Sequence, residues 1–365
     1  MKAMKIITTV CWIITALAIA GLATWFLTGT LYGIRINGRN TNRPFNLNFS
    51  VGGWENLTGP YELAGSYNVG TSGLDSVNID WIAGNIDVKP HDGSEVVVNE
   101  YAQRQLNDEE KLYLNTTGST LTVRFREHSF SGNMPHKRLE VLIPRSLCEA
   151  LNRFTLDTTS GSVHVDYINA DTFRVDSISG SIELTNIISR TFNTGSTSGS
   201  ITIKDAHPED MRINSISGSI RVSDSGAKVV DVDSTSGSIT LSGAFDSVKL
   251  NSISGRQKVE NSAQRSVLVA ESTSGSMEFS GSFDNAKLHS LSGSVDLRST
   301  VVPSKVEVDN TSGSITIAIP NEGSISVHHS STSGRLSSDI PMTIQSSGAQ
   351  FELSTLSGSV RIVEI

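Results

Sequence analysis

Apolar and polar residues alternate along most of the chain after residue 70, and a Ser-Gly pair interrupts the alternation at regular points. A period of two is typical of strands with one buried face, whereas a helix needs apolar residues three and four apart. The glycine of the pair recurs eleven times at spacings of 18 to 24 residues, most often 19. These glycines are Gly161, Gly180, Gly199, Gly218, Gly237, Gly255, Gly275, Gly293, Gly313, Gly334 and Gly358.

Four positions around each glycine carry the apolar residues: seven and five before it, and two and four after it. Around Gly180 they are Phe173, Val175, Ile182 and Leu184. The four positions are apolar in 40 of 44 cases, and the residues between them are polar. Each unit is therefore predicted to be a strand, a tight corner, a second strand and a short return, with glycine at the corner because it tolerates positive φ.

A single unit cannot bury its own apolar residues, so neighbouring units must stack on one another. The predicted fold is all-β, a two-sheeted β-solenoid (β-helix-like) of about 19-residue Ser-Gly repeats over residues 151–365. The sequence leaves open whether one or two units close each coil. The last unit, Phe351–Ile365, carries few charges and is expected to form a poorly protected end of the stack.

The pattern begins before the first Ser-Gly pair. Val77, Ile79, Ile86 and Val88 occupy the four apolar positions around Gly84, where Trp81 and Ala83 replace the serines. The strands that follow have longer connections. We therefore expect residues 71–150 to form an irregular N-terminal β cap on the solenoid.

Residues 1–34 contain an apolar segment long enough to span a bilayer as one N-terminal transmembrane helix. Lys2 and Lys5 ahead of this segment, with Ala18-Ile19-Ala20 further on, also resemble a cleaved secretory signal. The apolar run continues past that site, which favours an uncleaved anchor in the lipid bilayer. Both interpretations imply export, so the expected location is the cell membrane, single-pass, with the repeats outside the cytoplasm. Residues 35–70 are predicted to be a juxtamembrane spacer.

The composition excludes several classes of function. The chain has 365 residues and a net charge of -8, which argues against nucleic acid as a partner because no basic face is available. Cys11 and Cys148 are the only cysteines, so neither a disulfide framework nor a zinc site is expected. The eight histidines lack the spacing of metal ligands, and no Gly-x-Ser-x-Gly motif occurs.

Acidic side chains recur on the outward face four residues before several of the glycines, where they could form a ladder for a cation. They are Asp157, Asp176, Asp233, Glu271 and Asp309, and neutral residues such as Gly195 and Asn214 interrupt them. A solvated face is the favoured interpretation. We therefore predict no catalytic, cofactor-binding or metal-binding residues, and no cofactor.

The residue two before each glycine alternates between threonine and a large aliphatic residue over most of the repeat, and the period of two turns it outward. The aliphatic residues on alternate units are Ile178, Ile216, Ile253 and Leu291. Corner packing explains the alternation in one interpretation. In the other, these residues form a contact stripe.

Several stretches together resemble one known family. They are Val77–Val88, Asp92–Val98, Leu139–Pro144 and the Ser-Gly-Ser-Ile type repeats from Ser160 onward. This set is similar to a bacterial adhesin-like family of β-strand-repeat, toast-rack type envelope proteins of unknown function. The resemblance covers roughly residues 70 to 365 and implies a membrane-attached, outward-facing β-solenoid. It also implies a link to surface adhesion or envelope-stress signalling, and it brings no catalytic residues.

The predicted function is therefore binding at the cell envelope by a membrane-anchored, adhesin-like solenoid, with a role as an accessory to envelope-stress sensing. Envelope polysaccharide or membrane proteins are the candidate partners. Two alternatives stay open: a passive structural spacer and a carbohydrate-active β-helix enzyme. The enzyme would need a cleft, for which only Arg104–Lys111 and Arg126–His136 have room, with acids from Asp108 to Glu110 as candidates.

Overall fold

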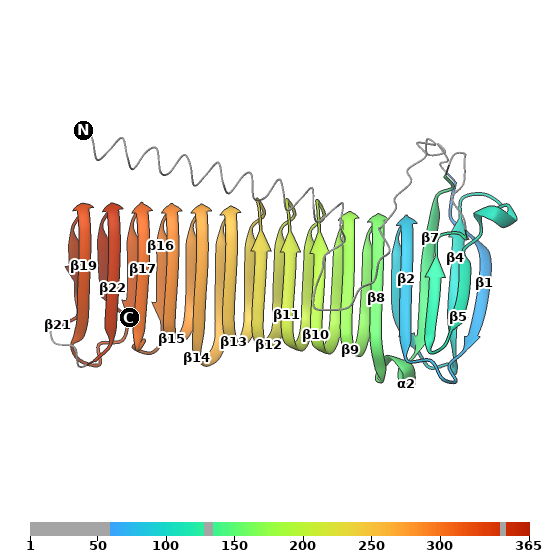
Figure 1. The fold of residues 1–365 in the computed structure, drawn as a ribbon, viewed down its shortest axis with the longest axis horizontal. Coiled ribbons are helices and arrows are strands. Elements are labelled where there is room, and N and C mark those ends of the chain that lie inside the picture. The colour runs from blue at the N-terminus through green and yellow to red at the C-terminus, as the bar shows by residue number, and fades with distance from the viewer. Residues whose placement is uncertain (1–58, 128–133, 344–347) are drawn as a thin grey trace. The chain divides into compact units, whose positions relative to one another are not determined.

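The computed structural model describes residues 59–127, 134–343 and 348–365, which form one row of stacked strands (Figure 1). Helical structure in these ranges consists of the 3₁₀ turn η1 (Asp108–Glu110) and the helix α2 (Arg145–Cys148). Neither is long and apolar enough to cross a membrane. The predicted transmembrane segment at 1–34 lies outside the described residues.

The all-β prediction is confirmed. The strands of the cap are β1 (Glu62–Gly70), β2 (Ser76–Ala83), β3 (Ile86–His91), β4 (Glu95–Ala102), β5 (Tyr113–Thr117), β6 (Thr120–Arg124) and β7 (Lys137–Pro144). The long strands of the stack are β8 (Leu151–Ser160), β9 (Val163–Ser179), β10 (Ile182–Ser196), β11 (Ile201–Ser215), β12 (Ile220–Ser234), β13 (Ile239–Ser254), β14 (Gln257–Ser274) and β15 (Met277–Ser292). Shorter strands complete it: β16 (Val295–Ser299), β17 (Lys305–Ser312), β18 (Ile315–Ile319), β19 (Ile325–Ser333), β20 (Leu336–Ser338), β21 (Met342–Thr343), β22 (Gln350–Ser357) and β23 (Val360–Glu364).

One repeat unit closes each coil. In β10 and β11 the parallel register pairs Ile182 with Ile201 and Ser196 with Ser215, so each residue lies beside the one 19 positions later. The same register relates β9 to β10. Residues at equivalent repeat positions therefore form columns along the stack, and the chain rises by one strand spacing per unit.

Each of the strands β9 to β15 reverses direction at a second bend, the return, which is also where the two predicted sheets join. Tyr167, Asn186, Asp205 and Asp224 lie six residues after a corner glycine and have φ between 52° and 61°. Asparagine and aspartate tolerate this left-handed conformation better than most residues. Because the strands run on through the return, the two faces are halves of one continuous 23-stranded sheet.

The corners stack so closely that they require glycine. A Cβ added to Gly180, which has φ +127°, would lie 2.1 Å from the carbonyl oxygen of Gly161 in the next rung. Glycine therefore gives the corner both its positive φ and its close approach to the neighbouring backbone.

The predicted apolar columns form a continuous core between the two faces. Phe154, Phe173 and Phe192 stack on successive rungs with ring centroids 5.3 and 5.2 Å apart. Their side chains are fully buried, as are the aliphatic residues of the neighbouring columns. This interior holds the rungs in register and leaves the alternate residues on the surface.

The order of the last rungs differs from their order in the sequence. β17 pairs with β22, and β22 pairs in turn with β19, so the C-terminal unit lies between two earlier ones. The expectation that Phe351–Ile365 forms the end of the stack is therefore wrong. The end consists of the unit that contains β19, β20 and β21, because the chain passes over one rung position and then returns to fill it.

The cap closes the other end of the stack. β6 and β7 pair in parallel with β2 and β3, in the manner of one more rung. Beyond them β5 and β4 run antiparallel, and β1 pairs antiparallel with β4. β1 lies within the stretch 35–70 for which the sequence suggested a spacer.

Candidate contact surface

The corners place the predicted stripe in one column on the surface. Ile178, Ile216, Ile253 and Leu291 all lie two residues before a corner glycine, and the columns beside them are in register. Ile178 is 40% exposed and the others are partly exposed. The outward orientation predicted from the period of two is therefore confirmed, whereas contact through these residues stays a prediction.

The alternation is more regular in space than in the sequence. Along the chain it fails after Thr311, because Thr332 follows before Leu356. In the structure Leu356 lies between Thr311 and Thr332, since β22 stacks between β17 and β19. At the cap, Ile82 lies beside Thr159 and adds one more aliphatic position.

Twelve residues thus form an unbroken alternating column in the described part of the chain, which we call the corner column. In spatial order they are Ile82, Thr159, Ile178, Thr197, Ile216, Thr235, Ile253, Thr273, Leu291, Thr311, Leu356 and Thr332. The full corner surface also includes the residues on either side of each corner glycine.

The corner surface carries little charge. The residue before the glycine is serine in every Ser-Gly unit, and the residue after it is serine except at Arg256 and Arg335. Arg256 pairs with Glu278 on the next rung. The surface is therefore a band of hydroxyl groups with an aliphatic side chain on every second rung.

Two residues of the predicted acidic ladder stack beside this band, together with Asp80 of the cap. Asp80, Asp157 and Asp176 are register neighbours, and Arg174 contacts Asp176 at 2.6 Å and Asp157 at 3.6 Å. Burial raises the pKa of Asp157 to about 6, the Arg174 guanidinium opposes this rise, and the negative charges of Asp176 and Asp80 add to it. Gly195 continues the column without a carboxylate. No group of three or more metal-ligating side chains occurs in the ranges that the structure covers.

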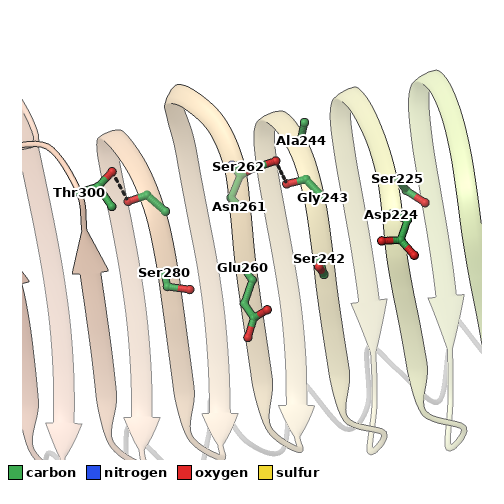
Figure 2. A pocket seen from close by; sticks show the side chains of 11 residues that line it. Asp224, Ser225, Ser242, Gly243, Ala244, Glu260, Asn261, Ser262, Ser280 and Thr300 are labelled. Atoms are coloured by element: carbon green, nitrogen blue, oxygen red, sulfur yellow. Dashed lines mark hydrogen bonds between the residues drawn. The ribbon is translucent and has the colours of Figure 1, made fainter.

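An open groove of about 600 Å³ lies near the returns of β12 to β15 (Figure 2). Its lining includes Asp224, Glu260 and Asn261. The Asn261 side chain accepts a hydrogen bond from the backbone nitrogen of Phe245 at 2.9 Å and donates one to its oxygen at 2.8 Å. Lys258 lies 2.6 Å from Glu260. The Asn261 side chain thus supplies hydrogen-bond partners for backbone groups at the irregular bend. We therefore assign the groove a structural role.

A fully buried ion pair lies inside the cap. Lys137 Nζ is 2.6 Å from Glu100 Oε1, and it also donates to the carbonyl oxygens of Glu110 and Phe125. The Phe125 ring centroid is 4.0 Å from this ammonium. Burial lowers the pKa of Lys137 to about 8, and the Glu100 carboxylate opposes the decrease. Since both side chains have no exposed surface, this cluster belongs to the interior of the cap and cannot meet a substrate.

Two of the three acids considered for an enzyme are held in ion pairs. Two nitrogens of Arg104 donate to the two oxygens of Glu110, at 2.8 and 2.7 Å, and Lys111 contacts Asp108 at 2.7 Å. These hydrogen bonds lower the pKa of both carboxyl groups. A general acid must keep its proton near neutral pH, so neither group is suited to that role. The second candidate segment, Arg126–His136, lies partly outside the described residues.

The stripe predicted from the sequence left out two aliphatic members of the corner column: Ile82 at one end, and Leu356 beside Thr332 at the other. The signal for Leu356 was the break in the threonine–aliphatic alternation after Thr311. This break disappears when the unit of Gly358 is placed before the unit of Gly334. The signal for Ile82 was its position two residues before Gly84.

Ten solved chains match this chain, among them three from bacteria. A candidate adhesin from Bacteroides fragilis is 12% identical, with 82% of this chain and 96% of that chain covered and a TM-score of 0.34. A candidate adhesin from Parabacteroides distasonis is 10% identical, with 84% and 98% covered and a TM-score of 0.35. A candidate lipid-binding protein from the same species is 12% identical, with 84% and 98% covered and a TM-score of 0.32. At these identities and TM-scores they carry no argument about function.

The family comparison is more specific. No curated protein matches the chain. The sequence profile described as Toastrack DUF4097 matches residues 74–280 and 227–363, which together span the rungs and most of the cap. The adhesin-like, toast-rack type resemblance found in the sequence is thereby confirmed, and the chain belongs to the Toastrack DUF4097 family.

Proposed function

We propose that this chain is a single-pass membrane protein whose solenoid is displayed outside the cytoplasm and acts by contact, as an adhesin-like module of the cell envelope. The apolar segment at 1–34 supports the anchor, since about 20 apolar residues suffice to cross a bilayer. A role as an accessory to envelope-stress sensing belongs to the same proposal.

The corner surface is the observation that carries the proposal. It presents partly exposed aliphatic side chains at every second rung over a length of about 50 Å, at one strand spacing per rung. The other exposed aliphatic residues of the long strands form no comparably long series: Ile188 has Asn169 and His207 as register neighbours, and Val229 and Val267 are a single pair on either side of Ser247. A repeated apolar feature on an otherwise hydroxyl-lined surface is typical of an interaction site.

Binding without turnover fits the described chemistry better than catalysis does. The acids at Asp108 and Glu110 are paired with cations, and the buried Lys137 is inaccessible. A passive spacer would also lack a reactive site, but it would have no need for a regular aliphatic column.

The first test locates the protein. The full chain is expressed in a bacterial host, cells are fractionated, and intact cells or spheroplasts are treated with protease. The proposal predicts that the chain is recovered with the membrane and that the solenoid is cut only from the outside. Recovery in the soluble cytoplasmic fraction would contradict it.

The second test measures contact. Full-length protein in mild detergent is immobilised and incubated with solubilised envelope material from the same host, including its polysaccharide. Retention of an envelope component, without release of sugar fragments, supports the proposal. Release of sugar would support the enzyme instead, and absence of any retained component, further copies of this chain included, would support the spacer.

A further inference from the structure

The alternation in the corner column does not follow from the backbone of the corners. The corners of Gly199, Gly218 and Gly237 share a hydrogen bond from the glycine nitrogen to the serine three residues before it. The corners of Gly275 and Gly293 instead donate from that nitrogen to the next rung. Both groups of corners contain threonine and aliphatic rungs, so the alternation is a property of the side chains.

The corner column also has an even number of positions, which determines how two copies related by a two-fold axis face each other. It has twelve positions in the described residues, starts with the aliphatic Ile82 and ends with Thr332. When a second copy faces the first in the antiparallel direction, position n lies opposite position 13 − n, so an odd position always meets an even one. Ile178 then faces Thr311, Ile216 faces Thr273, Ile253 faces Thr235 and Leu291 faces Thr197.

We propose that the partner of the corner surface is a second copy of this chain, which docks antiparallel about a two-fold axis so that each aliphatic side chain enters the gap above a threonine of the other copy. This inference rests on the proposed function, since it names the partner of the same surface. An isologous interface requires one patch to be complementary to itself, and the parity of the column meets that requirement over its whole length.

Charge and area agree with such a pair. In the antiparallel arrangement Arg256 lies opposite Ser238 and Arg335 opposite Asn85, so no two cations of the corner surface meet. Three residue columns of about 10 Å total width and about 50 Å length bury roughly 1,000 Å² over both copies. That area is at the lower end for a specific interface, and it predicts reversible association in the micromolar range.

An antiparallel pair carries its two caps at opposite ends. Each cap leads back towards the N-terminal segment of its own chain. The arrangement therefore suits chains anchored in two facing membranes, which gives the adhesin-like function a homotypic form.

Sedimentation of the full chain in mild detergent, from about 1 to 100 µM, tests the association. We expect a monomer–dimer equilibrium in the wild type and at least a tenfold weaker one in the variant with Ile178→Ser, Ile216→Ser, Ile253→Ser and Leu291→Ser. The matched control carries Ile188→Ser, Val229→Ser and Val267→Ser, which are exposed aliphatic positions outside the corner column. A wild type that stays monomeric at the highest concentration, or equal dimerisation of both variants, overturns the proposal.

Disulfide crosslinking tests the direction. In a Cys11→Ser background, in which Cys148 is buried, chains with Ile178→Cys are mixed with chains with Thr311→Cys and oxidised. The antiparallel pair predicts a heterodimer and little crosslinking of either chain with itself, because identical positions lie seven rungs, about 34 Å, apart. Crosslinks between two Ile178→Cys chains overturn the antiparallel register.

The proposed contact function and the proposed self-pairing can fail separately. If the chain stays monomeric while the quadruple serine variant loses retention of envelope material, the self-pairing is wrong and the contact function stands. If the chain dimerises as predicted but retains no envelope component, homotypic pairing is the contact and the search for another partner ends.

Discussion

The two edges of the stack, corners on one side and returns on the other, are built from the same repeat but differ in regularity. The corner edge keeps a serine and a glycine on every Ser-Gly unit, and its residues stay in register from rung to rung. The return edge absorbs the differences in repeat length, for example at the register shift between Asn261 and Ser266.

The physical reason for the difference is the spacing of the backbones. At the corners the glycine of one rung leaves no room for a side chain beside the next, as the 2.1 Å approach at Gly180 shows. At the returns, insertions point into solvent and can be accommodated by side-chain hydrogen bonds such as those of Asn261. A surface that must repeat at a fixed interval is therefore available only at the corners.

The largest difference between the edges is expected for alanine at glycine positions. Gly180→Ala combines a positive φ with contact to the Gly161 carbonyl, and should cost at least about 3 kcal/mol of unfolding free energy. Gly226→Ala at the return edge places its Cβ 3.0 Å from the Ala244 oxygen and should cost about 1 kcal/mol. Urea denaturation of the two variants measures both, and equal losses would contradict the comparison.

The returns vary in length, but side-chain hydrogen bonds to the backbone still hold their conformation. Asn261→Ala removes the partner of both backbone polar groups of Phe245 and should cost about 2 kcal/mol. Ser262→Ala, in which the neighbouring exposed hydroxyl is lost, is the matched control and should cost under about 0.5 kcal/mol. If thermal denaturation gave the same shift for both variants, the bonds of Asn261 would not be what holds the bend.

A smaller difference in unfolding free energy is expected between corners with and without a hydrogen bond from the glycine nitrogen to the serine three residues before it. The Ser215 hydroxyl accepts from the Gly218 nitrogen at 3.0 Å, so Ser215→Ala should cost about 1 kcal/mol. The Ser272 hydroxyl is buried without a partner among the described residues, so Ser272→Ala should be neutral or stabilising. Urea midpoints distinguish the two, and a larger loss at Ser272 would refute the assignment.

The smallest effect concerns pH. Because the pKa of Asp157 is raised to about 6, mainly by burial, the folded chain holds this proton more tightly than the unfolded chain does. Its contribution to stability is complete below the unfolded pKa of 3.8 and is lost as pH rises through about 6. Asp157→Asn should therefore stabilise the chain by less than about 1 kcal/mol at neutral pH and leave it unchanged near pH 3.5. A gain that grows towards low pH would have the wrong sign.

The repeat and its faces could be predicted from the sequence because each depends on local rules. Period-two alternation determined the strands and their buried columns, and the Ser-Gly pair marked the corners. The returns left a weaker signal: Asn186, Asp205 and Asp224 share the position six residues after a glycine.

The order of the last rungs could not be predicted in the same way. The units around Gly334 and Gly358 both carry the Ser-Gly pair, so the corner pattern gives no reason for either to stack on Gly313. In the structure Gly358 lies against Gly313, and Gly334 lies against Gly358. The order of the last rungs is indicated only by a comparison between units, because it restores the alternation of Thr311, Leu356 and Thr332. Interpreting each unit by itself does not use this comparison.

The claim that the corner edge is the contact surface is tested most directly by comparing edge variants in one binding measurement. The full chain in mild detergent is titrated onto envelope sheets from cells that display the wild-type chain. It is added as wild type, as the corner variant with four serines at Ile178, Ile216, Ile253 and Leu291, and as the control with three serines at Ile188, Val229 and Val267. The account predicts that the corner variant loses at least tenfold in apparent affinity while the control binds like the wild type. Equal binding by all three proteins would contradict it.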